Sequence, residues 1–234
     1  MKPAYNGIGT LSERSLHASL KDWMAEPGDE IEKIVDGYHI DIVRGPLLIE
    51  IQTRNFSAIK RKLSDLIEDH QVRLVHPIAS AKWIQRVDKD GRNVSRRKSP
   101  RRGRVEHLFQ EMIRIPELAI HPNFSVQVIL LHEEEIWKDD GNGSWRRKYW
   151  SIHDRRLLKV IDSVLLPSAG DYLSLLPMGL PKEFSNRQLS SELKIPNNLA
   201  RKMTYSLRKM GLLKTVGKNG NAYLFNIAKD AIRP

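Results

Sequence analysis

Cysteine is absent from this chain of 234 residues, which excludes disulfides, thiolate zinc sites and a cysteine nucleophile. No run of about 18 apolar residues occurs, so the sequence predicts no transmembrane helix and no membrane partner. The segment Met1–Gly7 lacks the apolar core of a signal peptide, so we expect a cytoplasmic protein, nucleoid-associated in a bacterium or an archaeon. Neither a Walker loop nor a dinucleotide fingerprint is present. With 40% hydrophobic and 29% charged residues, the composition is that of a globular protein.

Acidic excess is also absent, and the formal net charge is +11. The positive charge is concentrated in two segments. Residues 91–105 carry seven basic and no acidic side chains, and residues 177–234 carry eleven basic and three acidic ones. The remaining segments are close to neutral or slightly acidic. This uneven distribution favours a polyanionic partner, and nucleic acid is the partner that it fits best.

Two acidic residues fall in a predicted β-hairpin near the N-terminus. Residues 38–43 and 47–53 alternate as strands do, around a tight turn at Gly45. This turn would bring Asp41 of the first strand beside Glu50 of the second. Like charges in an otherwise apolar hairpin are costly unless a cation lies between them. A divalent metal is the simplest neutralising group, and oxygen ligands suit Mg²⁺ or Mn²⁺. The alternative is a solvent-facing pair on an edge hairpin.

The spacing of Asp41, Glu50 and Gln52 resembles the motif of the PD-(D/E)XK nuclease superfamily, which includes restriction endonucleases and Holliday-junction resolvases. The resemblance covers roughly residues 8–80. It implies an α/β fold with a restriction-endonuclease-like αβββαβ core. Two positions depart from the motif, since Gln52 replaces the usual Lys and Ile40 replaces the expected Pro.

The resemblance also implies metal-assisted phosphodiester hydrolysis. Asp41, Glu50 and the carbonyl of Ile51 would hold Mg²⁺ or Mn²⁺, which would activate a water molecule and neutralise developing charge. Gln52 cannot replace the charge of a Lys, but it can orient the water by hydrogen bonds. A slower or more metal-dependent enzyme is the expected consequence.

Further candidates come from the two flanking helices. Glu13 is expected to assist the metal, or to complete a local capping box with Thr10. His17 lies one turn later and faces the same site or a partly buried surface. Lys60 is expected to supply the missing cation from the second helix, where Lys62 is a neighbour. The alternative for both lysines is a solvated basic face.

The first 165 residues are expected to form the nuclease-like domain. The pattern predicts helices over 11–25 and 56–69, three strands within 31–53, and a strand over 72–78. Residues 91–105 are expected to form an exposed basic loop. Residues 105–165 are expected to contain a helix, a strand over 125–136 and a second helix.

Residues 168–234 are expected to form a second domain. Helices are predicted over 168–176, 186–193 and 199–210, followed by strands over 212–216 and 222–227. Ser185 is a plausible N-cap, and Gly211 suits the end of a helix. This order resembles a winged helix-turn-helix. The resemblance implies DNA binding, while binding of a protein partner is the alternative.

The basic residues of these regions are the predicted DNA contacts. Those next to the motif or in the basic loop are Arg54, Arg96, Arg97, Lys98, Arg101 and Arg102. Those of the third helix and the wing are Arg201, Lys202, Tyr205, Arg208, Lys209, Lys214 and Lys218.

Two further clusters have less specific meanings. Glu133, Glu134 and Glu135 are interpreted as an exposed strand end, with a second metal cluster as the alternative. The segment Trp145–Trp150 interleaves aromatic and basic residues, which suits base stacking or a core Trp with solvated cations.

The sequence therefore predicts a metal-dependent DNA endonuclease that acts on duplex or branched DNA and is positioned by a winged helix. Cutting both strands usually needs two active sites, so a homodimer is one expected state. The alternative is a catalytically inactive, nuclease-like DNA-binding regulator, or a scaffold protein of a mobile element or defence system.

Overall fold

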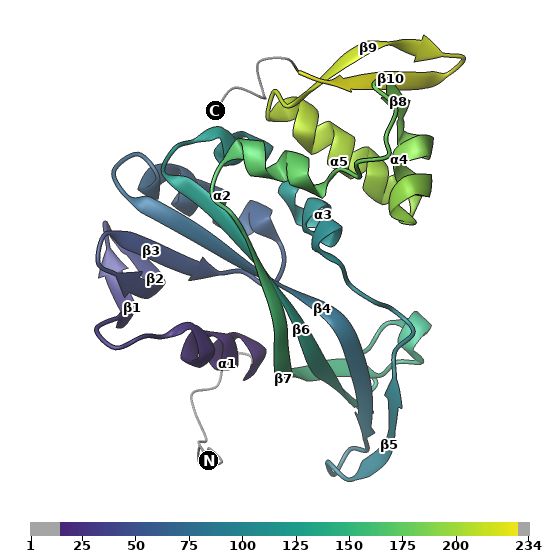
Figure 1. Cartoon of the computed structure of the whole chain (residues 1–234). Coiled ribbons are helices and arrows are strands. Elements are labelled where there is room, and N and C mark those ends of the chain that lie inside the picture. Colours follow the sequence, from purple (N-terminus) through teal and green to yellow (C-terminus); the bar gives the residue numbers. More distant parts are fainter. Residues whose placement is uncertain (1–14, 229–234) are drawn as a thin grey trace.

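A computed structural model describes residues 15–228 and shows a mixed α/β architecture built on one large sheet (Figure 1). The seven strands of this sheet are β1 (Glu30–Val35), β2 (Tyr38–Arg44), β3 (Leu47–Ile51), β4 (Gln71–Val87), β5 (Asn93–Lys98), β6 (Phe124–Lys138) and β7 (Ser151–Leu166). The strand order is β1-β2-β3-β4-β6-β7, and β5 pairs with β4. The pairs β3–β4 and β4–β6 are parallel and all others are antiparallel, so the sheet is mixed.

Helical segments connect these strands. They are α1 (Ser15–Met24), α2 (Phe56–Leu66), the 3₁₀ helix η1 (Val105–Leu108), α3 (Phe109–Met112), the 3₁₀ helices η2 (Pro116–Ile120), η3 (Trp145–Arg147) and η4 (Ala169–Leu175), α4 (Asn186–Leu193) and α5 (Asn197–Lys209). The order from α1 through β1, β2, β3 and α2 to β4 confirms the predicted αβββαβ succession.

Tight turns set the register of the first three strands. Asp36 and Gly37 both have positive φ, 49° and 80°, as a two-residue hairpin turn between β1 and β2 requires. Gly45 has a φ of 54° in the turn between β2 and β3. The predicted turn at Gly45 is thus confirmed, and Ile42 pairs with Ile49 across it.

Apolar residues cover both faces of the large sheet. Leu16 and Leu20 of α1 pack with Ile49 and Ile51 of β3 in one buried cluster. Phe56 and the other buried residues of α2 belong to a second cluster, which also includes α3, α4 and α5. The sheet therefore has α1 on one face and α2 and α3 on the other, and residues of α4 and α5 extend the second cluster.

Two segments differ from the sequence prediction. Residues 93–98 lie in the expected basic loop 91–105 but form strand β5, which pairs with residues 83–87 of β4. Residues 151–166, where a helix was expected, form the long edge strand β7. The helix prediction was wrong because the apolar spacing of this segment also fits a strand, and pairing with β6 along its whole length decides the outcome.

Strands β3 and β5 both pair with the same edge of β4, and the stretch of β4 between them has no strand partner on that edge. The β3 pairing ends at Val75, whose carbonyl accepts a hydrogen bond from the Gln52 amide, and the β5 pairing begins at Trp83. Pro77 is tolerated here because the amide that it lacks would point into this gap. Segment 99–104 crosses the gap, and the Gly103 amide donates to the Ala79 carbonyl (2.8 Å).

The C-terminal part of the described chain forms a smaller unit that keeps the predicted order, with the 3₁₀ helix η4 as its first helix and with the short strand β8 added before α4. Strands β8 (Phe184–Ser185), β9 (Leu213–Asn219) and β10 (Ala222–Ile227) make a three-stranded sheet in the order β8-β10-β9. Ser185 caps α4, since its hydroxyl accepts from the Gln188 amide, and Gly211 has a φ of 75° after α5. In Figure 1 this unit lies at one end of the large sheet, with α5 close to α3.

Within residues 15–228, no helix has the length and apolar content needed to span a membrane.

Candidate functional site

The two predicted carboxylates meet at the end of the β2–β3 hairpin. The pairing of Ile42 with Ile49 and of Val43 with Leu48, continued by one residue, sets Asp41 opposite Glu50. Both side chains are largely buried, with 15% and 12% of their surfaces exposed. The sequence prediction that Asp41 folds back beside Glu50 is confirmed.

Asp41 is fixed by α1 and by the backbone of β3. Its Oδ2 accepts a hydrogen bond from the Ile51 amide (2.7 Å). The same oxygen lies 3.2 Å from His17 Nε2, which is also 3.1 Å from the Ile51 carbonyl oxygen. His17 thus contacts two groups that the sequence proposed as metal ligands. Its neighbour in the prediction, Glu13, lies outside the described residues.

Glu50 is held by the helix that follows the hairpin. Lys62 Nζ of α2 donates to Glu50 Oε2 (2.6 Å) and also to the His39 carbonyl. Only 16% of the Lys62 side chain is exposed, so its charge is partly withdrawn from water. An ammonium group therefore lies beside the second carboxylate.

The two carboxyl groups respond differently to this environment. Burial raises the pKa of the Asp41 carboxyl, but hydrogen bonds from His17 and Ile51 and the charge of Lys62 together hold it below its usual value. Burial and the neighbouring Asp41 carboxylate raise the pKa of Glu50, against the opposite effect of Lys62. Two groups that share one environment thus have pKa values displaced in opposite directions.

The donor set fits a hard divalent cation. Two carboxylates and a backbone carbonyl are oxygen donors of the kind that Mg²⁺ and Mn²⁺ use. Burial first, and then the neighbouring Asp41 carboxylate, raise the pKa of Glu50 more than Lys62 lowers it. Among residues 15–228, no three His, Asp or Glu side chains are grouped so as to hold a metal by themselves. A cation bound here would therefore need the Ile51 carbonyl and water as further ligands.

Gln52 faces the turn rather than the carboxylates. Its Nε2 donates to the carbonyl of Arg54 (2.6 Å) and to that of Asn55 (3.3 Å). Asn55 has a φ of 60° and precedes the first residue of α2. The Gln52 side chain therefore stabilises the turn that leads into α2, the helix that carries Lys62.

Lys60 does not reach the site. Its ammonium group pairs with Glu117 of η2, and both side chains are about half exposed. The prediction chose the wrong lysine because residues 60 and 62 lie about 200° apart around a helix. Lys62, which the sequence offered only as a neighbour, occupies the position beside Glu50.

The basic hairpin of residues 83–98 carries several predicted DNA contacts. Arg96 pairs with Glu134 (2.6 Å), and its guanidinium lies 5.6 Å from the centre of the Trp83 ring. Lys98 also lies over that ring, at 4.9 Å. Arg97 is exposed. Two of these three predicted contacts, Arg96 and Lys98, are thus engaged within the protein.

A basic pocket of about 630 Å³ opens at the gap along β4. Its lining includes the predicted contacts Arg54, Arg101 and Arg102, together with Lys194 and Arg155, which the sequence did not single out. Arg54 follows Glu50 by four residues, so at most about 14 Å of extended chain separates them. Only the fold could have identified this group, because its members are scattered over 140 residues.

The predicted contacts on α5 divide into two sets. Arg201 and Arg208 are exposed, and Arg208 also lies over the Phe225 ring (5.9 Å). Tyr205 and Lys209 are also exposed, but they line a pocket of about 390 Å³ that they share with Lys60 of α2. One face of α5 is therefore turned toward the large-sheet unit. Lys202 is half-buried on the same helix.

The wing residues lie on the terminal hairpin. Lys214 and Lys218 are exposed on β9, and Lys218 Nζ lies 4.8 Å from the centre of the Tyr223 ring.

The acidic run Glu133–Glu135 is not the exposed strand end that the sequence suggested. It lies inside β6, and each carboxylate is buried and paired with a cation. The pairs are Glu133 with Arg155, Glu134 with Arg96 and Glu135 with Lys82. The prediction failed because this run lies in a central strand, between β4 and β7, with cations of β4, β5 and β7 beside it.

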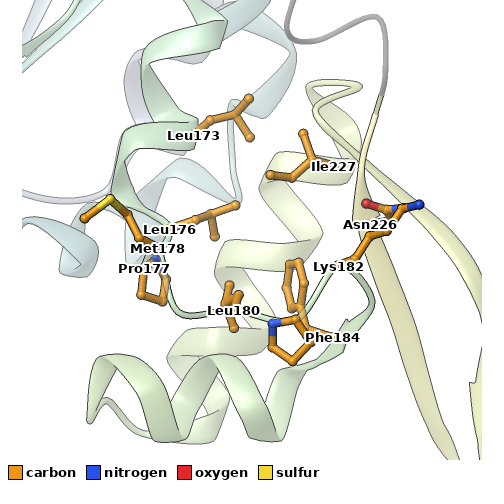
Figure 2. Close-up of a pocket in the computed structure, with 10 residues that line it drawn as sticks. Leu173, Leu176, Pro177, Met178, Leu180, Lys182, Phe184, Asn226 and Ile227 are labelled. Atoms are coloured by element: carbon orange, nitrogen blue, oxygen red, sulfur yellow. The ribbon is translucent and has the colours of Figure 1, made fainter.

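An apolar pocket of about 450 Å³ lies apart from these groups, between η4 and β10 (Figure 2). Leu173, Leu176, Phe184 and Ile227 line it, with Lys182 as its one charged side chain. It contributes no residue to the carboxylate site.

Residues 14–167 match the family described as a domain of unknown function (DUF8091), so the chain belongs to that family. A protein of Treponema pallidum (strain Nichols), described as an uncharacterized protein, is 32% identical over 178 residues. That alignment covers 76% of this chain and 71% of the relative. No solved structure matches the chain.

Proposed function

We propose that this member of the DUF8091 family is a metal-dependent DNA endonuclease of the PD-(D/E)XK type. The observation that carries the proposal is the convergence of Asp41, Glu50 and Lys62 at the end of one hairpin. An acidic pair with an adjacent lysine is the set that the nuclease motif requires, although the lysine comes from α2 instead of position 52. The αβββαβ order of elements supports a restriction-endonuclease-like core.

Asp41, Glu50 and the Ile51 carbonyl would hold Mg²⁺ or Mn²⁺, which supplies a bound water of lowered pKa and positive charge at the phosphate. In the reaction a water oxygen bonds to phosphorus and one P–O ester bond breaks, which leaves a phosphate monoester and a hydroxyl. Lys62, held beside Glu50, stabilises negative charge on the phosphoryl oxygens. His17 keeps Asp41 and the Ile51 carbonyl in position.

Residues 168–234 are proposed to be a winged helix-turn-helix domain that positions the nuclease on DNA. Three helical segments followed by the β9–β10 hairpin support this assignment, as does the excess of basic residues. Arg201 and Arg208 are exposed on α5 outside the pocket that Tyr205 and Lys209 line, and they are available to DNA together with Lys218 on the wing. Tyr205 and Lys209 are poorer candidates because they line a pocket against the large-sheet unit.

The test is cleavage of labelled duplex, single-stranded and four-way-junction DNA with Mg²⁺, with Mn²⁺ and with a chelator. The proposal expects cutting of duplex or junction DNA that stops in the chelator. Binding without cutting under every condition would overturn it.

A non-catalytic DNA-binding regulator is the second candidate. The engagement of the Gln52 Nε2 by two backbone carbonyls favours it, since that nitrogen is then not free to donate to a water molecule. Titration with Mn²⁺ separates the two candidates. The endonuclease requires a Mn²⁺ site that Glu50→Gln removes. The regulator instead binds DNA equally well as wild type and as Glu50→Gln, in the absence of metal.

A further inference from the structure

The basic pocket at the β4 gap combines many cations with few acids. Its carboxylates, Glu111 and Glu133, already accept hydrogen bonds, from the Phe56 amide (3.2 Å) and from Arg155 Nη2 (2.5 Å). Glu133 is paired with Arg155, whereas Glu111 accepts from a neutral amide and keeps its negative charge. The unpaired cations of the pocket outnumber that one charge. The charge balance of the pocket is therefore decided by its unpaired cations.

Four cationic side chains of the pocket make no hydrogen bond or ion pair within the described part of the chain. They are Arg54, Arg101, Arg102 and Lys194. They come from the turn between β3 and α2, from segment 99–104 and from the turn between α4 and α5. Like charges repel, so their convergence raises the free energy of the empty pocket. An anion bound among them would relieve that repulsion.

Two further donors border the same space. The Nε of Arg155 is buried and has no hydrogen-bond partner among residues 15–228. Helix α5 begins beside the pocket, directly after Pro196, and no side chain caps its first turn. Backbone amides at a helix N-terminus attract anions, which adds to the effect of the side chains.

We propose that this pocket binds a phosphate monoester, either the terminal phosphate of a nucleic-acid strand or that of a free nucleotide. A monoester carries nearly two negative charges at pH 7 and three acceptor oxygens, which four cations match better than they match a diester. A concave site takes in a group that projects from its ligand. A continuous backbone would instead lie across a surface.

The position of the pocket favours the end of a nucleic-acid strand as the source of the phosphate. Thr53 and Arg54 line it and directly follow the segment that carries Glu50. A strand held there by its terminal phosphate would pass the carboxylate pair within a few nucleotides. This last step rests on the proposed endonuclease function, whereas the binding of a phosphate monoester does not.

The test measures binding in a chelator, so that catalysis plays no part. Matched ligands are a short single strand with a 5′-phosphate, a 3′-phosphate or hydroxyls at both ends, and AMP against adenosine. We expect at least tenfold tighter binding of one phosphorylated form. Preference for a phosphorylated strand identifies the strand end, and preference for AMP alone identifies a free nucleotide. Equal affinity for phosphorylated and unphosphorylated ligands would overturn the proposal.

The double variant Arg102→Gln/Lys194→Gln locates the site. Both side chains are exposed and unpaired, so the variant should unfold at the wild-type denaturant concentration. Arg61→Gln is the matched control, because Arg61 is 91% exposed on α2 and outside the pocket. The phosphate preference should vanish in the double variant and persist in the control. A preference that survives in the double variant places the phosphate elsewhere and refutes the assignment.

Discussion

Lys62→Met removes the ammonium group beside Glu50 and keeps the length of the side chain. The pair is short, 2.6 Å, and both partners are less than one fifth exposed, so water screens it weakly. Loss of one preorganised donor to a developing oxyanion typically costs about 10²- to 10³-fold in kcat. DNA affinity should change little, because the charge of Lys62 is mostly taken up by Glu50.

The same substitution should lower stability. Removing one partner of a buried pair leaves an uncompensated charge, and the cost is about 3 kcal/mol in the free energy of unfolding. Lys62→Met/Glu50→Gln should regain part of that loss, because no buried charge is then left unpaired. Denaturant unfolding of the single and double variants measures both effects.

Lys60→Met is the matched control on the same helix. Lys60 pairs with Glu117 at the surface, where such pairs are worth about 0–1 kcal/mol. We expect near-wild-type cleavage and stability. Single-turnover cleavage of a labelled duplex compares the two variants directly. Loss of activity in Lys60→Met with retention in Lys62→Met would refute the assignment of Lys62.

Three further results are expected. Gly103→Ala should destabilise segment 99–104 by about 1–3 kcal/mol and weaken binding of phosphate ligands, because a Cβ there would lie 2.5 Å from the Ala79 carbonyl oxygen. Denaturant unfolding tests this, and an unchanged midpoint contradicts it. Burial lowers the pKa of His76 in the folded protein, so below about pH 6.5 the unfolded chain takes up a proton that the folded chain does not. The free energy of unfolding should therefore fall as pH drops below about 6.5, by up to about 1.4 kcal/mol per pH unit. Unfolding curves of His76→Gln should lack this part of the pH dependence, and parallel curves for the two proteins would count against it. Arg97→Gln/Arg101→Gln should reduce the slope of log affinity for DNA against log salt concentration by about 2, because one counterion is released for each phosphate contact. An unchanged slope would exclude both residues from the interface.

Short-range signals made the carboxylate hairpin predictable. The Asp36-Gly37 and Gly45 turns, with alternating apolar residues on either side, determine the register that brings Asp41 opposite Glu50. The α4 and α5 helices were predictable for a similar reason, since Ser185 and Gly211 mark their boundaries. Local turn and capping chemistry is sufficient where the partner element is a sequence neighbour.

Elsewhere the sequence prediction failed because strand pairing between distant segments decides the structure. Residues 151–166 become strand β7 because β6 offers a partner along their length, which no local pattern reveals. The burial of Glu133–Glu135 follows from the position of β6 between β4 and β7. The basic pocket depends on where β3 ends and β5 begins along β4, so residues as distant as Arg54 and Lys194 meet only in the folded chain.

The most direct test compares the rates at which wild type, Asp41→Asn and Glu50→Gln cut labelled duplex DNA in Mn²⁺. Glu117→Gln is the control, since that carboxylate is about half exposed and pairs with Lys60, outside the site. The account predicts metal-dependent cutting by the wild type and the control, and no cutting by either site variant while both still fold and bind DNA. Cutting that persists in both site variants, or no cutting by the wild type, would contradict it.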